Sequence, residues 1–355
     1  MFQLPERRKK ILAKYSYSLA VKFDSEDDEL IYSGVFFYNK NIVDDIEIRK
    51  NAIIINFVRS SKMKTEMVLD SPKSNIRYQL QRVLCFYLAV IGNIPDVDSI
   101  TFTCSGETVD IPHESFTCHW KNCDIDICLP VESAKVVFES ENCKYFYIMI
   151  SHFLKSQLDH FSHDRFRSAW STLNAVYTYM DSINNEDTYR SENNKLSTLM
   201  YIIDKNTMNY SVDRIKRLKN DDFWEHISWY NAFHDFSEKD FKSLISGSLY
   251  NDSELLGYIC NHMRVFSEEI INDEESWAIL KEKSTKKNNR PKDRLKFIVC
   301  RYCYMMRNKS FHAETIYPLF VISDDAETRI EKILTEVLLL TIKDLFILYA
   351  DKLNN

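Results

Sequence analysis

Glycine is scarce in this sequence, with five residues among 355. Tight turns that need positive φ angles favour glycine, so the composition disfavours a turn-rich barrel and favours helices. The two common glycine-rich phosphate loops, GxxxxGK[ST] and GxGxxG, are both missing from the sequence. Their absence argues against a P-loop enzyme and against a dinucleotide-binding enzyme.

The sequence also lacks a long apolar run. Its most apolar windows, residues 83–92 and 336–350, are shorter than the ~20 residues that a membrane-spanning helix needs. Lys343 and Asp344 interrupt the second window, and no apolar export signal follows the first ten residues. We therefore expect a cytoplasmic protein with no membrane partner, in which the nine cysteines are reduced.

The remaining composition is that of an ordinary globular protein, with 45% hydrophobic and 28% charged residues. A length of 355 residues leaves room for about two domains. The formal net charge is −6, so an interface with nucleic acid would need a local basic surface.

Residues 1–145 mix two kinds of hydrophobic pattern. Short β-branched or aromatic runs bounded by polar clusters are typical of strands. Such runs occupy residues 30–38, 52–58, 65–70, 99–104, 124–130 and 135–140. Residues 75–92 instead place apolar side chains three and four positions apart, which predicts a helix. The pattern predicts an α+β domain over residues 1–145.

Residues 146–355 show almost only the helical period. Apolar side chains recur at spacings of three and four. The predicted helices are 162–180, 195–204, 238–246, 253–266, 268–282, 292–313 and 326–352. Polar segments at 181–195 and 281–293 are predicted to be loops. Such a run of helices predicts an all-α bundle over residues 146–355.

A strongly basic segment lies between Lys281 and Lys309. It holds eleven lysines and arginines, opposed only by Glu282 and Asp293 within the segment. Such a cluster can attract a polyanion and steer its approach. A solvated loop would show the same composition. The segment leads into the predicted helix 292–313, which favours a functional interpretation.

Helical geometry groups the polar residues of that predicted helix. At 100° per residue, Arg301, Asn308 and His312 fall within about 40° of one another, and Arg294 lies on the same side. Arg307 lies at the edge of this stripe and can reach it with its long side chain. The predicted RNA contacts along the stripe are Arg294, Arg301, Tyr304 and Lys309.

These residue types suit metal-free cleavage of RNA. The 2′-hydroxyl of RNA can attack the neighbouring phosphate if one proton is removed and another is supplied. Histidine, with an unperturbed pKa of about 6.5, can transfer protons near neutral pH. Arginine offers a planar, permanently charged fork for phosphate oxygens. The Arg-to-His spacing alone is close to what chance would produce in this sequence.

The combination of residues is more specific than the spacing. RNKSFH (307–312), at the end of a helix rich in aromatic residues and methionine, resembles the Arg-x4–6-His motif of the HEPN superfamily (higher eukaryotes and prokaryotes nucleotide-binding). The segment DRFRSAWSTLNAVY (164–177) is similar to the Phe-x3-Trp helix of HEPN domains in bacterial abortive-infection proteins, including the ApeA-like group.

The resemblance implies an all-α HEPN-like bundle that forms a homodimer, with two motifs in one cleft. It implies a metal-independent endoribonuclease without a cofactor, acting in anti-phage defence or as a toxin. Arg307 would bind phosphate, Asn308 would assist, and His312 would be catalytic. The substrate would be RNA, with tRNA as one candidate. The domain 1–145 would then be a sensor, a regulator or an RNA-positioning module, responding to a phage-derived or nucleotide trigger.

Two other functions stay open from the sequence. A HEPN-like domain could bind nucleotide, RNA or protein without cleaving anything. A metal-dependent hydrolase could use His160 and His163, or a cysteine cluster with nearby histidines. The candidate ligands of the cluster are His113, Cys118, His119, Cys123, Cys128, Cys300 and Cys303. We expect Cys300 and Cys303 to be buried thiols, and Trp224 and Trp229 to belong to the core.

Overall fold

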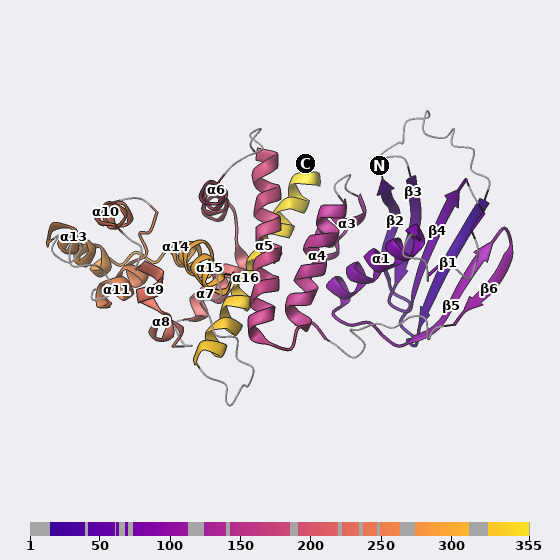
Figure 1. Cartoon of the computed structure of the whole chain (residues 1–355), viewed down its shortest axis with the longest axis horizontal. Helices are drawn as coiled ribbons and strands as arrows, with labels where there is room; N and C mark the ends of the chain where they lie inside the picture. The colour runs from indigo at the N-terminus through magenta and orange to yellow at the C-terminus, as the bar shows by residue number, and fades with distance from the viewer. Residues whose placement is uncertain are drawn as a thin grey trace. The chain divides into compact units, whose positions relative to one another are not determined.

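The chain divides into two compact units (Figure 1). One comprises Met1–Leu158 with Tyr349–Asn355, and the other Asp159–Leu348. A computed structural model describes residues 15–39, 42–60, 62–63, 68–69, 74–112, 124–139, 143–184, 191–218, 222–233, 237–246, 249–262, 274–311 and 326–354. An N-terminal antiparallel sheet followed by a mostly helical region confirms the coarse expectation of α+β followed by helices.

The first unit contains a six-stranded antiparallel sheet with the strand order β2-β3-β4-β1-β5-β6. The strands are β1 (Tyr15–Phe23), β2 (Leu30–Asn39), β3 (Ile42–Arg49), β4 (Ala52–Arg59), β5 (Val97–Cys104) and β6 (Glu107–Ile111). Along β1 and β4 every second side chain is buried, as expected for a sheet with one covered face. Helix α1 (Asn75–Ile91) packs on that face, where Tyr87 contacts Phe23 with 5.1 Å between ring centroids.

Short helices complete the covered side of the sheet. Helix α2 (Val131–Ala134) and α3 (Val136–Glu139) follow each other, and Phe138 of α3 packs on Phe36 of β2. Helix α4 (Cys143–Leu158) packs on α1 and α3. The boundary predicted after residue 145 therefore falls inside α4, and the first unit continues to Leu158.

The predicted strands 30–38, 52–58 and 99–104 are confirmed as β2, β4 and β5, and the helix 75–92 as α1. Residues 124–130 contain no strand, and the predicted strand 135–140 is also wrong, because Val136–Glu139 form α3. Of the predicted strand 65–70, only Val68 and Leu69 are described, and they form a turn.

Gly92 ends α1 in the left-handed conformation, with φ 97°. A Cβ atom there would lie 3.2 Å from Sγ of Cys128. Gly92→Ala should therefore lower the free energy of unfolding by about 1 kcal/mol or more, because it adds strain and a close contact. Gly257 lies inside a helix, and a Cβ there would meet nothing within 4 Å. Gly257→Ala should instead raise the free energy of unfolding by about 0.5–1 kcal/mol. Urea unfolding should therefore show changes of opposite sign in the free energies of unfolding of the two variants.

The second unit is helical. Its elements are α5 (Ser162–Asn184), α6 (Glu192–Lys205), α7 (Asn209–Arg217), α8 (Phe223–His226), α9 (Trp229–Phe233), α10 (Glu238–Ser246), α11 (Ser253–Asn261), α13 (Glu274–Thr285), α14 (Pro291–Lys296), η6 (Phe297–Tyr302), α15 (Cys303–Phe311) and most of α16 (Ala326–Asn354). The predicted helices thus have counterparts, while α7, α8 and α9 were not predicted. The predicted loops are shorter than expected, because α5 continues to Asn184 and α13 to Thr285.

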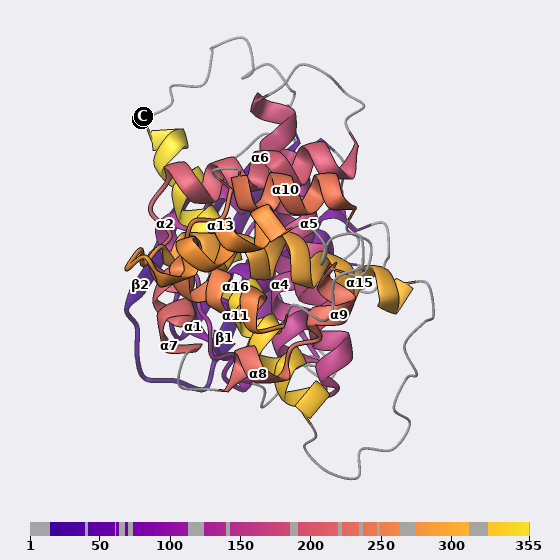
Figure 2. The same cartoon turned by 90° about the vertical axis from the view of Figure 1, so that its left-hand side faces the viewer.

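One central helix, made of α14, η6 and α15, has neighbours on two sides. α14 packs on α6 and α7, and α15 packs on α5. Phe297 stacks on Trp229 and Phe233 of α9, with 5.7 Å between ring centroids in each pair. Helices α9, α10, α11 and α13 lie together at one end of the second unit in Figure 1, the end that faces the viewer in Figure 2. Trp224 and Trp229 are 1% and 3% exposed, which confirms that they belong to the core.

The central helix is not a regular α-helix. Phe297–Tyr302 form a π-helical segment, η6, between two α-helical parts. Five of its six residues are buried, because the helix here crosses the interior and meets neighbours all around it. A π turn holds more residues than an α turn, so it changes which side chains share a face. The uniform 100° spacing assumed for residues 292–313 therefore fails across η6.

Candidate functional site

Helix α15 packs against α5 and carries part of the predicted site. On α5, Phe166, Trp170, Leu173 and Tyr177 follow one another at helical spacing, and all four are buried. The half-buried ring of Tyr304 lies 6.1 Å from the ring of Trp170, measured between centroids. This packing fixes α15 on α5, and Arg307 and Asn308 follow one helical turn later.

Arg307 and Asn308 contact each other directly. Nη1 of Arg307 donates to Oδ1 of Asn308 at 2.8 Å, and both residues are half-buried. The amide therefore holds one edge of the guanidinium. Asparagine can do this without neutralising the charge of the arginine, because its amide is uncharged.

A tyrosine and a glutamate extend this cluster. The hydroxyl of Tyr177 donates to Oε1 of Glu192, the first residue of α6. Burial and this hydrogen bond raise the pKa of the Tyr177 phenol, while the positive charge of Arg307 acts in the opposite direction. Arg307 is thus close enough to Tyr177 to influence its ionisation. Three elements, α5, α6 and α15, contribute polar groups to one cluster, which we call the Arg307 cluster (Tyr177, Glu192, Arg307 and Asn308).

The other predicted residues of the motif are not placed. His312 lies outside the described residues, and Lys309 belongs to α15 without a described side chain. Their roles stay predictions. Sequence reasoning did not find Tyr177 or Glu192. The sequence offered one local signal for the position of Glu192. Ser191 directly precedes it, and the side chain of Ser191 caps the start of α6.

Comparison with known proteins assigns no family to this cluster. No family model, curated protein or solved structure matches the chain. Its chemistry must therefore be judged from its own geometry and charges.

Arg294 is buried and paired in the structure, which argues against the predicted contact with RNA. Its side chain is 3% exposed, and its guanidinium contacts Glu254 at 2.8 Å and Asp252 at 3.4 Å. A second edge donates to Oδ1 of Asn289 at 2.9 Å. A buried guanidinium held by two carboxylates has little surface left for RNA, so this contact stays a prediction that the structure disfavours.

Arg301 and Arg307 have neighbours on different elements. Nε of Arg301 donates to the backbone carbonyl of Ala232 in α9 at 2.9 Å. Arg307 instead belongs with α5 and α6. The structure therefore does not join Arg294 and Arg301 to Arg307 as one stripe, because Arg301 lies within η6 and each arginine has its own partners. Contact of Arg301 or Tyr304 with RNA stays a prediction.

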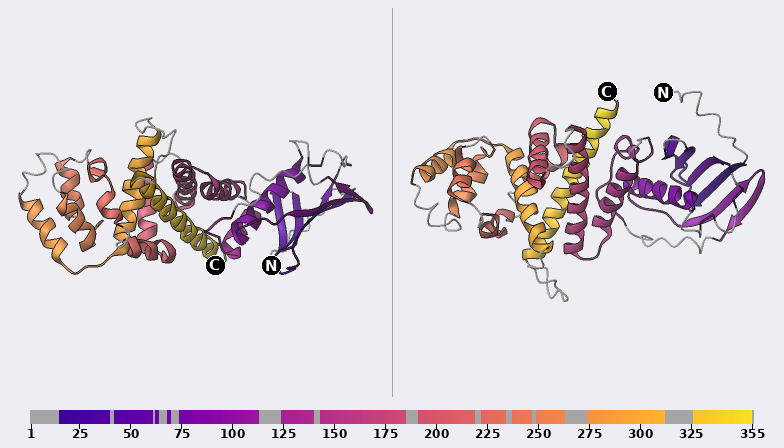
Figure 3. Two further views of the ribbon diagram at one scale, coloured as in Figure 1. Left: turned by 90° about the horizontal axis from the view of Figure 1, so that it is seen from below. Right: turned by 45° about the horizontal axis from the view of Figure 1, so that its top comes forward.

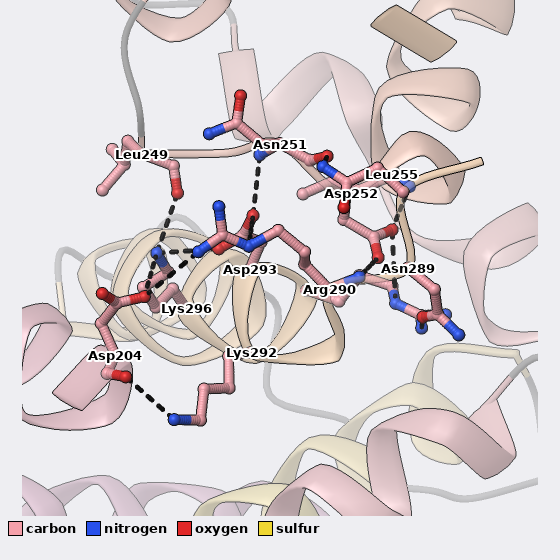
Figure 4. A network of polar contacts seen from close by, with 12 residues as sticks. Asp204, Leu249, Asn251, Asp252, Leu255, Asn289, Arg290, Lys292, Asp293 and Lys296 are labelled. Atoms are coloured by element: carbon pink, nitrogen blue, oxygen red, sulfur yellow. Dashed lines mark hydrogen bonds and ion pairs between the residues drawn. The ribbon is translucent and has the colours of Figure 1, made fainter. Parts of the chain in front are cut away.

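Part of the positive charge predicted in the basic segment is paired with two carboxylates, Asp293 within the segment and Asp204 from α6 (Figure 4). Lys296 contacts Asp293 at 2.9 Å and Asp204 at 3.5 Å. Arg290 lies 3.6 Å from Asp293 and 3.7 Å from Asp204. The excess counted in the sequence thus overstates the charge that the folded protein presents.

Among the candidate metal ligands, His163 takes part in a structural contact. Nδ1 of His163 lies 3.0 Å from Oε1 of Glu331, and the hydroxyl of Ser162 donates to the other oxygen of that carboxylate at 2.8 Å. These contacts hold α16 next to the start of α5 (Figure 3). Within the described ranges, no three histidine, cysteine or acidic side chains come together as a metal would require. His113, Cys118, His119 and Cys123 lie outside those ranges.

Cys300 and Cys303 are buried thiols, as expected. Burial raises the pKa of both thiols. A raised pKa disfavours the thiolate that binds zinc or attacks a substrate.

None of the helices in the described part of the chain is both long enough and apolar enough to cross a membrane.

Proposed function

We propose that the chain is a HEPN-like, metal-independent endoribonuclease whose phosphate-binding residue is Arg307. The observation that carries the proposal is the contact between Arg307 and Asn308, on a helix end that packs against α5. The amide orients the guanidinium and leaves its charge intact. An oriented guanidinium can bind two oxygens of one phosphate, which is the recognition that strand cleavage requires.

In the proposed reaction, the 2′-hydroxyl attacks the adjacent phosphorus and the 5′-oxygen leaves. The proton of the 2′-hydroxyl passes to a base, and the 5′-oxygen receives a proton from an acid. Arg307 stabilises the charge that accumulates on the phosphate oxygens. His312 follows five residues after Arg307 and would carry a proton. The products are a 2′,3′-cyclic phosphate and a free 5′-hydroxyl.

A single copy contributes one His312, whereas the reaction transfers two protons. We therefore propose a homodimer in which two copies contribute one imidazole each to a shared cleft. The same proposal places the enzyme in the cytoplasm, in anti-phage defence or as a toxin. The first unit would sense a phage-derived or nucleotide trigger or position the RNA substrate, for which tRNA is a candidate.

The proposal is tested by the metal requirement and by the ends of the product. Purified protein should cut RNA in the presence of EDTA and leave 2′,3′-cyclic phosphate ends, detected by mass spectrometry. The matched control is an RNA of the same sequence with 2′-O-methyl groups, which has no attacking hydroxyl and should stay intact. Cleavage of the methylated RNA, or complete inhibition by EDTA, would contradict the mechanism.

Glu192 favours a second candidate, a HEPN-like module that binds nucleotide, RNA or protein without cleaving. Its carboxylate accepts the hydrogen bond of Tyr177 in the Arg307 cluster. A negative charge there repels a phosphate approaching Arg307. Under this alternative, the protein would bind ligand while RNA remained intact, both before and after exposure to a triggering phage extract.

A further inference from the structure

The end of α6 meets the start of α14 at a set of ionic contacts. Nζ of Lys292 donates to the backbone carbonyl of Asp204 at 2.9 Å. The side chain of Asp204 lies 3.7 Å from Nη2 of Arg290 and 3.5 Å from Nζ of Lys296 (Figure 4). These contacts fix the relative position of two segments that are far apart in the sequence.

Exposed side chains gather around this junction. Tyr201 is 63% exposed, and Nζ of Lys205 lies over its ring, 6.0 Å from the centroid. The two residues are four positions apart on α6 and share a face of the helix. Arg290 keeps 43% of its side chain exposed, and Lys287 is exposed in the loop that leads to it.

The charges of this surface do not cancel. The two segments contribute five cations here, Lys205, Lys287, Arg290, Lys292 and the buried Lys296, against two carboxylates, the 35% exposed Asp204 and the buried Asp293. The neighbouring Lys286 is paired with Glu282 at 2.8 Å and adds no net charge. Within a protein of net charge −6, this is a local excess of positive charge beside an exposed aromatic ring.

We propose that this surface, the α6 patch (Tyr201, Lys205, Lys287, Arg290 and Lys292), binds the backbone of single-stranded RNA. The lysines and Arg290 bind phosphates, and a base stacks on Tyr201. Such a pairing of cations with an exposed aromatic ring is how proteins bind single strands without reading their sequence. The inference rests on the proposed ribonuclease function, for which it supplies a place where the substrate docks.

The position of the patch fits that role. Helix α6 begins at Glu192 in the Arg307 cluster and ends at Lys205 in the α6 patch. Fourteen residues of α-helix span about 20 Å. RNA lying along α6 would therefore contact the patch a short distance from the phosphate to be cut. An anionic membrane is the rival partner, but among the described residues at this junction only Tyr201 and Leu249 offer exposed apolar surface to insert into lipid.

The test is equilibrium binding of a 2′-O-methyl oligonucleotide, which cannot be cut by the proposed route, followed by fluorescence anisotropy at several salt concentrations. Lys205→Ala combined with Lys287→Ala should reduce the slope of log affinity against log salt by about 1.4, at about 0.7 for each lost contact with a single strand. Tyr201→Ala should weaken binding about fivefold to a hundredfold and leave the slope unchanged. The control is Lys155→Ala combined with Lys239→Ala, which removes the same charge from exposed positions on α4 and α10.

An unchanged slope and affinity in the patch variants would overturn the α6 patch, as would equal effects in the control. So would binding to vesicles rich in phosphatidylserine by a wild type that ignores the oligonucleotide. If the wild type cuts RNA and the patch variants bind RNA as tightly as the wild type does, only this inference is overturned. A wild type that binds through the patch and never cuts RNA overturns the nuclease and leaves the patch.

Discussion

Cleavage of RNA should fall by about a hundredfold or more when Arg307 is replaced by alanine, because one lost donor to a developing oxyanion costs about that much in other enzymes. The variant should fold, since the residue is half-buried and its hydrogen bond to Asn308 stays within α15. Single-turnover cleavage of a fluorescent RNA in EDTA measures the rate. Arg307→Lys should fall in between, because it keeps the charge and loses the planar fork.

The matched control for Arg307 is Arg217→Ala. Arg217 is an exposed arginine on α7, and its Nε donates to the carbonyl of Asp213 at 3.4 Å. Its removal takes the same charge from the same unit and should change the rate less than about threefold, through the general field of the protein. If Arg307→Ala cuts RNA as fast as the wild type, the phosphate-binding role of Arg307 is lost, even if other evidence supports a nuclease.

The helical half of the fold was predictable because its signal is local. On α5, Phe166, Trp170, Leu173 and Tyr177 recur every three or four residues, and burying that stripe requires only that some partner exists. The same pattern cannot show what lies on the other side. The approach of Glu192 to Tyr177 depends on how α6 packs on α5, which a single sequence does not specify.

The error at residues 135–140 shows where a local signal is too short. Val136 and Val137 favour a strand by propensity, and the four residues of α3 cover only about one helical turn, too few for the helical period to repeat. In the structure, the guanidinium of Arg82 in α1 donates to the carbonyl of Val137, and Phe138 packs on Phe86. These contacts join residues far apart in the sequence, and such tertiary contacts can outweigh the β propensity.

The sequence overstates the excess positive charge of the basic segment for a related reason. Opposing charges were counted only among residues 281–309, whereas Asp204, Asp252 and Glu254 come from α6, the loop before α11 and α11 itself. A buried cation needs such a partner, because taking an unpaired charge out of water is costly. A solvent-accessible cation does not have this requirement. The proposed α6 patch is therefore built on accessible cations and does not include the buried Arg294.

The acidic partners can be tested through stability. Asp252→Ala should lower the free energy of unfolding by about 3 kcal/mol or more, because it breaks a buried ion pair and removes a helix cap. Asp252 is fully buried and accepts hydrogen bonds from the backbone amides of Leu255 at 2.9 Å and Arg290 at 2.6 Å, while it also faces Arg294. Tryptophan fluorescence during urea unfolding should report mainly this unit, since four of the five tryptophans lie in it: Trp170, Trp224, Trp229 and Trp277.

Asp213→Ala is the control for this loss of stability. Asp213 pairs with Lys216 at 2.9 Å, but both side chains are more than half exposed, so the pair should contribute less than about 1 kcal/mol. Asp252→Asn should lie between the two, because an amide keeps the cap oxygen and removes the charge facing Arg294. Equal stability of Asp252→Ala and Asp213→Ala would mean that Arg294 needs no buried partner. The assignment of Arg294 to the fold would then fail, and its guanidinium would again be a candidate contact for RNA.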